Sequence, residues 1–293
     1  MEVQGVNIKN ENVNSILECS KLNWSVRTEE LQTASGIIIP ENIAIIRNDT
    51  NKVLSVRGKD YQPYQNEQMA ELIYKVSDKT GLKLHRGGFF NDGAKTFIQL
   101  KSGDLTLGND KIEGQISILN SYDGSTSLCW GNSTLTISCL NTFFGAMKQL
   151  DNKIRHTKNM AIRIEDVCRK VEMALNDEKE LFNNIMKLSE TPLDKAIKDQ
   201  IIRTFFKIPK DVDLTDNEQI STRTQNQISR FYIDMDGELK EKGQTLWGGL
   251  SSLTKFTTHS ISKGKKDYDS DSKLFNQYGD RERLVYNQLI SMV

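Results

Sequence analysis

A local excess of positive charge lies near the middle of the chain, where several side chains could hold an anion together. Between residues 148 and 170 seven Lys or Arg residues occur with three acidic ones, an excess of four positive charges. The side chains expected to contact a nucleic-acid backbone there are Lys148, Lys153, Arg155 and Lys158. Cations at the start of a helix do not complement its dipole, so an anionic partner would explain their position. An ordinary solvated helix start is the alternative that charge alone leaves open.

A second group of side chains, in the first half of the chain, could complete such a site. Arg86, Lys95 and Lys101 are further candidates for phosphate contact, because guanidinium and ammonium groups pair with phosphate oxygens. Phe89 and Tyr122 are candidates for base stacking, since an aromatic ring accepts any base on its face. The simpler interpretation of their glycine-containing segments is a hairpin connection at residues 85–93 and a structural turn at residues 120–125.

Signatures of catalysis are scarce. The chain has no GxxxxGK[ST] phosphate loop, no GxGxxG turn, no GxSxG elbow and no HExxH helix. The three histidines, His85, His156 and His259, have no partner at metal-ligand spacing. We therefore expect a protein that is not an enzyme and that needs no metal and no cofactor. An enzyme acting on a nucleotide or a DNA end is the least favoured hypothesis.

The elements that must position these residues follow from periodicity and turn residues. β-branched runs at residues 36–47 and 53–57, separated by turn-forming residues 48–51, predict a hairpin. Apolar residues from Met69 to Val76 recur at helical spacing, and Gly81 stands where a glycine ends a helix. Strand signals punctuated by glycines dominate residues 82–140, which favours antiparallel connections.

Past residue 141 the strand signals give way to helical periodicity. Helices are expected within residues 160–190, from Pro192 with Thr191 as N-cap, over 217–232 and over 281–291. The sequence thus predicts an α+β fold, with an antiparallel β-sheet core carrying one or two helices and a mostly α-helical C-terminal half. The expected divisions are an N-terminal arm (1–35), a β-rich core domain (36–150) and a helical region packed on or extending from it (151–293).

Composition limits the class of protein. The 293 residues include 39 basic and 39 acidic side chains, so the net charge is zero, which argues against a wholly basic nucleic-acid binder but allows a local basic site. The four cysteines form no CxxC pair, which fits a reduced compartment. No apolar run approaches the roughly 20 residues that span a bilayer, and the first residues lack the order of a signal peptide. We expect no membrane insertion and no secretion.

Four short blocks, taken in order and spacing, give the chain a family resemblance. They are Tyr61-Gln-Pro-Tyr-Gln-Asn66, then Asn120-Ser-Tyr-Asp-Gly-Ser125 running into Thr136-Ile-Ser-Cys-Leu-Asn-Thr142, then Ile154-Arg-His-Thr157, and Thr245-Leu-Trp-Gly-Gly-Leu-Ser-Ser-Leu-Thr254 with His259. Over residues 36–290 the chain resembles the phage/plasmid-like protein family, a domain of unknown function. At the level of fold it is similar to phage single-strand annealing recombinases of the Red-beta and Rad type.

The resemblance implies a function for the basic residues. Annealing recombinases form homo-oligomers that hold single-stranded DNA in a basic groove. By analogy we expect a homo-oligomeric single-stranded DNA-binding protein in the cytoplasm of a bacterial host. It would promote strand annealing in phage or plasmid recombination or replication, without nucleotide hydrolysis. The alternative is a phage-encoded structural or interaction protein with no nucleic-acid role, whose helical half forms the contact surface.

Overall fold

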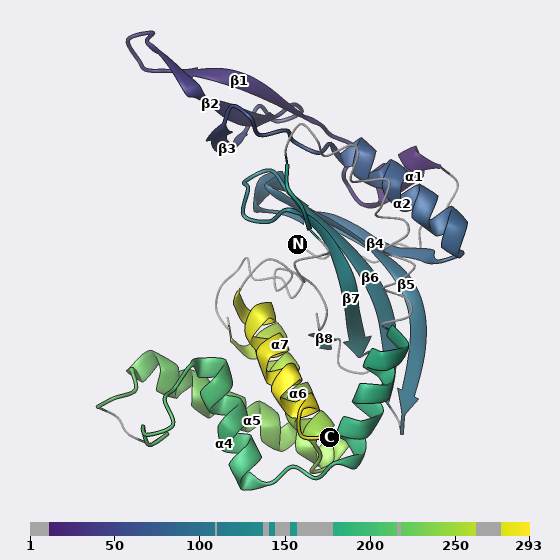
Figure 1. Cartoon of the computed structure of the whole chain (residues 1–293), viewed down its shortest axis with the longest axis vertical. Coiled ribbons are helices and arrows are strands. Elements are labelled where there is room, and N and C mark those ends of the chain that lie inside the picture. Colours follow the sequence, from purple (N-terminus) through teal and green to yellow (C-terminus); the bar gives the residue numbers. More distant parts are fainter. Residues whose placement is uncertain are drawn as a thin grey trace. The chain divides into compact units, whose positions relative to one another are not determined.

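The computed structural model describes residues 12–108, 110–136, 141–143, 153–156, 178–215, 218–261 and 277–293. They form two compact units. The N-terminal unit contains the described parts of residues 1–103, 115–132 and 147–176, and the helical unit contains those of residues 104–114, 133–146 and 177–293. Antiparallel sheets lie in the first half of the chain and helices dominate the second (Figure 1), so the fold is α+β, as the sequence predicts.

Two antiparallel sheets are built from the first half of the chain. The smaller sheet has the order β1-β2-β3, with β1 at Val26–Gln32, β2 at Ile38–Arg47 and β3 at Val53–Gly58. The larger sheet has the order β4-β5-β6-β7-β8, and β9 pairs with β7. Its strands are β4 (Lys83–Phe90), β5 (Lys95–Leu107), β6 (Asp110–Ser121), β7 (Leu128–Thr136), β8 (Asn141–Phe143) and β9 (Lys153–Ile154).

The predicted hairpin at residues 36–57 is confirmed as β2 and β3. The two strands pair antiparallel, with Ile45 opposite Ser55. Asn51 closes the turn with φ 54°, a left-handed conformation that asparagine tolerates. The residues expected to form an arm contain helix α1 (Val13–Cys19), which buries Ile16 completely, and β1, which pairs with β2. These elements therefore contribute to the core and to the smaller sheet.

The predicted helix before Gly81 is confirmed as α2 (Asn66–Thr80). Met69, Ile73 and Val76 lie on its buried face, in one hydrophobic cluster with Ile98 and other residues of the larger sheet. Gly81 adopts φ 70°, and its N–H donates to the Ser77 carbonyl at 2.8 Å. Only glycine takes this left-handed conformation without a steric cost, so the helix ends where the sequence places its end.

The prediction of a connection over residues 85–93 is wrong for most of that segment. Residues up to Phe90 belong to β4, and only the short turn η1 (Asn91–Gly93) connects β4 to β5. Gly87 is needed for close packing and not for a turn, because a Cβ there would lie 2.5 Å from the Ser20 Oγ atom. A glycine can therefore mark the approach of a distant segment as well as a turn.

The helical unit confirms the helical character predicted for the second half. Helices occupy residues 178–190, α4 (Lys195–Phe206), α5 (Thr222–Lys242), α6 (Leu246–Lys255) and α7 (Gln277–Ile290), and the π-helical turn η3 (Phe256–Ser260) continues α6. The helix expected over residues 160–177 lies outside the described residues. Phe205, Phe231 and Phe256 are fully buried at the centre of this unit.

One predicted helix start is wrong. The helix that was expected to begin at Pro192, capped by Thr191, begins at Lys195. The Asp194 carboxylate accepts a hydrogen bond from the Ile197 N–H at 2.8 Å and is the actual N-cap. Pro192 instead forms an isolated β-bridge with Thr245. Aspartate caps at least as well as threonine, and the competition between two such residues is decided by the surrounding contacts.

Candidate functional site

Two blocks that are far apart in the sequence meet in the N-terminal unit through buried hydrogen bonds. The Asn120 side-chain amide donates to the Tyr64 carbonyl at 2.9 Å. The Tyr122 hydroxyl donates to the Asn66 side-chain oxygen at 2.9 Å. Both bonds are shielded from water, so they fix the segment that precedes and begins α2 against the end of β6 and the turn that follows it.

Tyr61 brings the third block into the same place. Its hydroxyl donates to the Ser121 carbonyl at 2.6 Å, and its ring lies 5.1 Å from the His156 ring, centroid to centroid, at an interplanar angle of 31°. The Gln62 N–H donates to the His156 carbonyl at 3.3 Å. Strand β9 ends two residues before His156 and pairs with β7, so the sheet holds the histidine beside the tyrosine.

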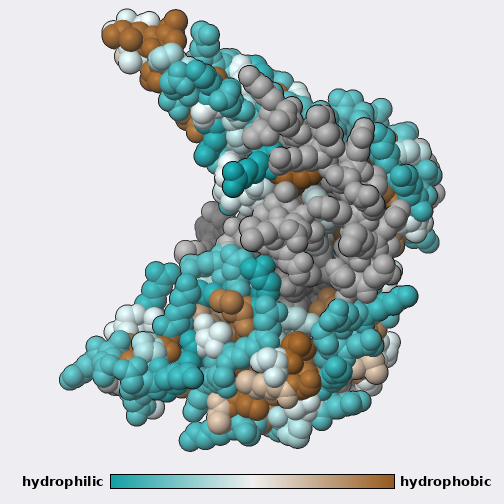
Figure 2. All heavy atoms as spheres, viewed as in Figure 1, coloured by the Kyte–Doolittle hydropathy of each residue, from teal (hydrophilic) through white to brown (hydrophobic). Residues whose placement is uncertain are grey.

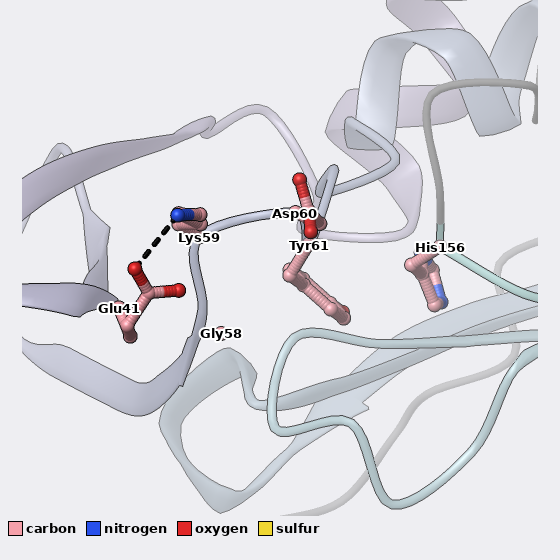
Figure 3. Close-up of a pocket in the computed structure, with 6 residues that line it drawn as sticks. All are labelled: Glu41, Gly58, Lys59, Asp60, Tyr61 and His156. Carbon is pink, nitrogen blue, oxygen red and sulfur yellow. Dashed lines mark hydrogen bonds and ion pairs between the residues drawn. The ribbon is translucent and has the colours of Figure 1, made fainter.

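A cavity of about 350 Å³ opens beside this junction (Figure 3). Its lining residues are Glu41, Gly58, Lys59, Asp60, Tyr61 and His156. The Lys59 ammonium and the Glu41 carboxylate form an ion pair of 2.8 Å on one side of Tyr61, and His156 is drawn on the other. The cavity thus combines an aromatic ring, an imidazole and three charged side chains.

Burial controls the charge of the imidazole. His156 is only 7% exposed, and neither of its ring nitrogens makes a hydrogen bond of ordinary geometry to a residue that the structure describes. Burial lowers the pKa of His156 to about 4, although backbone groups of Gln62 and Thr126 oppose part of this effect. The ring is therefore neutral at physiological pH and carries one N–H donor and one nitrogen acceptor, neither of which has a described partner at ordinary hydrogen-bond geometry.

Burial also keeps the tyrosine neutral. It raises the pKa of the Tyr61 phenol well above the usual range, while Arg57 lowers that pKa and Asp123 raises it by smaller amounts. The phenol therefore remains a hydrogen-bond donor at any physiological pH. With its hydroxyl bound to Ser121 and its ring beside His156, Tyr61 presents a ring of fixed orientation.

Comparison with known proteins places this arrangement in a family. The family described as domain of unknown function DUF932 matches residues 53–278, more than three quarters of the chain. The chain belongs to the DUF932 family. The matched span includes every residue that lines the cavity except Glu41. No curated protein and no solved structure matches the chain.

In this DUF932 protein only part of the predicted basic cluster can be located. Arg155 is exposed and directly precedes His156 in the chain, and Lys153 lies in β9. Lys148 and Lys158 lie outside the described residues. Arg155 is therefore next in the chain to a residue that lines the cavity but is not itself part of the lining, and a common surface of Arg155, Lys148 and Lys158 stays a prediction.

The predicted cations on the strands do not line the cavity. The half-buried Arg86 donates from Nε to the Gln99 side-chain oxygen at 2.5 Å. The Lys95 ammonium lies 4.0 Å from the Asp123 carboxylate, and its side chain is only 16% exposed. Lys101 is half-buried on β5. Arg86 and Lys95 thus have partners within the N-terminal unit.

The two predicted stacking residues have other roles. Tyr122 is completely buried and hydrogen-bonded to Asn66, so its ring is not available to a base, and that prediction needs correction. Phe89 is half-buried and packs edge-on against Trp24, with ring centroids 5.9 Å apart. The Arg47 guanidinium lies 4.8 Å from the Phe89 ring centroid, so this ring belongs to a local cation–π cluster.

Tyr61 and His156 were missed as site residues. Both lie in blocks that carry the family resemblance, and membership of these blocks is the sequence feature that could have identified them. Neither residue has a chemically suitable partner nearby in the sequence.

Among the described residues no group of three or more His, Cys, Asp and Glu side chains could hold a metal ion. No helix in the described parts of the chain has the length and apolarity to cross a membrane.

The fourth block takes part in a buried polar cluster of the helical unit. The Glu238 carboxylate is 1% exposed and accepts a hydrogen bond from the Ser251 hydroxyl at 2.8 Å. It also lies 3.1 Å from the Lys255 ammonium and 3.5 Å from the Lys242 ammonium, which itself contacts Asp110 at 2.8 Å. Because these charges are paired within the helical unit, we assign the cluster to helix packing and not to a second candidate site.

Proposed function

We propose that this DUF932 protein binds single-stranded DNA and promotes strand annealing in phage or plasmid recombination or replication. The observation that supports the proposal is a cavity walled by the Tyr61 and His156 rings, next to which the chain carries an exposed arginine, Arg155, as the residue before His156. Binding of single strands requires cations for the phosphates and ring faces for the bases, and this place in the molecule offers both.

The proposed activity needs no chemical step. Base pairing itself drives annealing, so the protein must only hold a strand with its bases accessible. The proposal includes a homo-oligomer, since a series of subunits would hold a longer strand than one subunit can, and it places the protein in the cytoplasm of a bacterial host. The zero net charge of the chain limits long-range attraction of DNA, so binding must depend on local contacts.

Fluorescence anisotropy with a labelled oligonucleotide tests the proposal. We expect binding that weakens as salt rises, because each neutralised phosphate releases counterions. Arg155→Ala should weaken binding to every sequence and lower the logarithmic salt slope by about 0.7, the contribution of one phosphate on a single strand. Arg223→Ala, at an exposed position in α5, is the matched control and should bind as wild type does. A folded protein that binds no oligonucleotide at low salt would contradict the proposal.

A second function, that of an interaction protein without a nucleic-acid role, is favoured by a different observation. In the hairpin of β1 and β2, the start of β2 and the residue before it expose three consecutive apolar side chains, with Ile37 66% exposed, Ile38 57% and Ile39 38%. Figure 2 shows apolar residues gathered at the end of this hairpin. Exposed apolar patches commonly mark protein contacts. Light scattering would favour this function if it shows a defined assembly whose size DNA does not change. The same protein should then bind no oligonucleotide in the anisotropy assay.

A further inference from the structure

We infer that the cavity beside Tyr61 and His156 receives one unpaired nucleobase of the bound strand, while the phosphates remain outside it. This inference rests on the proposed function and specifies which part of the strand enters the cavity. Its volume of about 350 Å³ is at the small end of the range for ligand pockets, which suits a single ring system.

The imidazole gives the first reason to expect a ligand. His156 is more than nine-tenths buried and lines the cavity, and within the described part of the chain neither ring nitrogen makes a hydrogen bond of ordinary geometry. Buried polar groups in proteins are nearly always hydrogen-bonded, and exceptions call for an explanation. Both ring nitrogens are almost without exposed surface, so a nucleobase, which carries donors and acceptors on its edges, would supply the partner once the imidazole turns a nitrogen toward the cavity.

The tyrosine gives the second reason. The Tyr61 ring is held at one end by the bond from its hydroxyl to Ser121 and beside it by the His156 ring. A ring that is already fixed loses little conformational freedom when a base packs against it, so such a platform favours binding. Stacking on an aromatic ring also accepts every base, as a strand of arbitrary sequence requires.

The charges of the lining favour a base over a phosphate. Among the lining residues Glu41 and Asp60 carry negative charge and Lys59 carries positive charge, while His156 is neutral at physiological pH. A phosphate inside the cavity would meet an excess of negative charge. A nucleobase carries no charge, so it avoids this repulsion, and Arg155 remains outside the lining for the backbone.

Gly58 makes the inference testable. A Cβ added there would have the Glu41 carbonyl oxygen, at 4.0 Å, as its nearest neighbour, and the backbone of Gly58 lies outside the left-handed region. A larger side chain at this position can therefore fill the cavity without removing any cation. Val53→Leu, on the same strand at an exposed position outside the lining, is the matched control.

The experiment compares an ordinary oligonucleotide with one of equal length whose central nucleotides are abasic. Wild type should bind the ordinary strand at least about fivefold more tightly, which is the lower limit for stacking of one base. Gly58→Leu should lose this preference and bind both strands as wild type binds the abasic one, while Val53→Leu keeps it. The fluorescence of 2-aminopurine in the ordinary strand should decrease on binding wild type and stay unchanged with Gly58→Leu.

The outcomes separate the inference from the proposed function. If wild type and Gly58→Leu both bind in a salt-dependent way and with the same preference for the ordinary strand over the abasic one, the strand binds and the cavity holds no base. The same conclusion follows when wild type binds but leaves 2-aminopurine fluorescence unchanged. If neither strand binds at low salt, the proposed function fails and the inference fails with it. A thermal unfolding curve shows whether Gly58→Leu is folded. If this variant does not fold, Gly58→Val takes its place, because valine favours strands.

Discussion

Acidification should destabilise the N-terminal unit through a single histidine. The pKa of His156 is lowered to about 4 by burial, whereas a histidine in an unfolded chain titrates near 6.5. Below pH 6.5 the unfolded chain binds a proton that the folded chain does not accept until pH 4. Lowering the pH therefore removes stability between about 6.5 and 4, and the contribution of His156 is fully present above this window.

The size of the effect follows from the two pKa values. Each pH unit within the window costs about 1.4 kcal/mol, so the change from pH 7 to pH 5 should remove about 2 kcal/mol of unfolding free energy. Carboxylates also titrate as the pH falls, and for this reason the quantity to compare is the difference between wild type and a variant. His156→Gln has a polar side chain that does not titrate. Between pH 7 and pH 5 the unfolding free energy of this variant should therefore fall by about 2 kcal/mol less than that of wild type.

Urea unfolding followed by tryptophan fluorescence at the two pH values provides the measurement. Trp24 and Trp130 are buried in the core of the N-terminal unit, and Trp247 lies in the helical unit. A Trp247→Phe background therefore restricts the signal to the N-terminal unit. His259→Gln, at an exposed position, controls for the loss of one histidine. Equal losses of stability in wild type and His156→Gln would refute the assignment of a buried neutral imidazole.

The other predictions concern the core that supports the site and the site itself. Gly87→Ala should lower the unfolding free energy by about 1–3 kcal/mol, because the added Cβ would lie 2.5 Å from the Ser20 Oγ atom. A second substitution, Ser20→Gly, should restore part of this free energy, and urea unfolding measures both effects. Tyr122→Phe should lower the unfolding free energy by about 1–3 kcal/mol, because the Asn66 oxygen loses its buried hydrogen-bond donor. Oligonucleotide binding should not change. Weaker binding by a folded Tyr122→Phe variant would contradict the conclusion that Tyr122 belongs to the core. Arg155→Ala and Gly58→Leu, compared in the binding assays described above, should separate contacts with the backbone from contacts with a base.

Local sequence signals predicted those elements whose boundaries depend on neighbouring residues. Helix α2 ends at Gly81 because a left-handed residue is needed there, and the hairpin of β2 and β3 has its turn at Asn51. The start of α4 was placed three residues too early, since Thr191 and Asp194 are both good caps and the sequence alone does not rank them. Element type was therefore more predictable than element boundaries.

Contacts between distant segments explain the errors at the site. Tyr122 lies in a turn that appears exposed in the sequence, but its ring points into the core toward Asn66. His156 has no partner nearby in the sequence, and only the pairing of β9 with β7 brings it beside Tyr61. Periodicity reports which face of one element is buried and carries no information on which segments meet, so the cavity could not be predicted.

The pairing of β9 with β7 has a consequence for the order of folding. During synthesis Tyr61 and the turn of residues 120–125 leave the ribosome well before His156 does, so the cavity cannot close until β9 has been made. Such a contact between segments far apart in the chain is among the slower ones to form. His156 is thus the last of the lining residues to be made, so the wall that it forms is added to the cavity late.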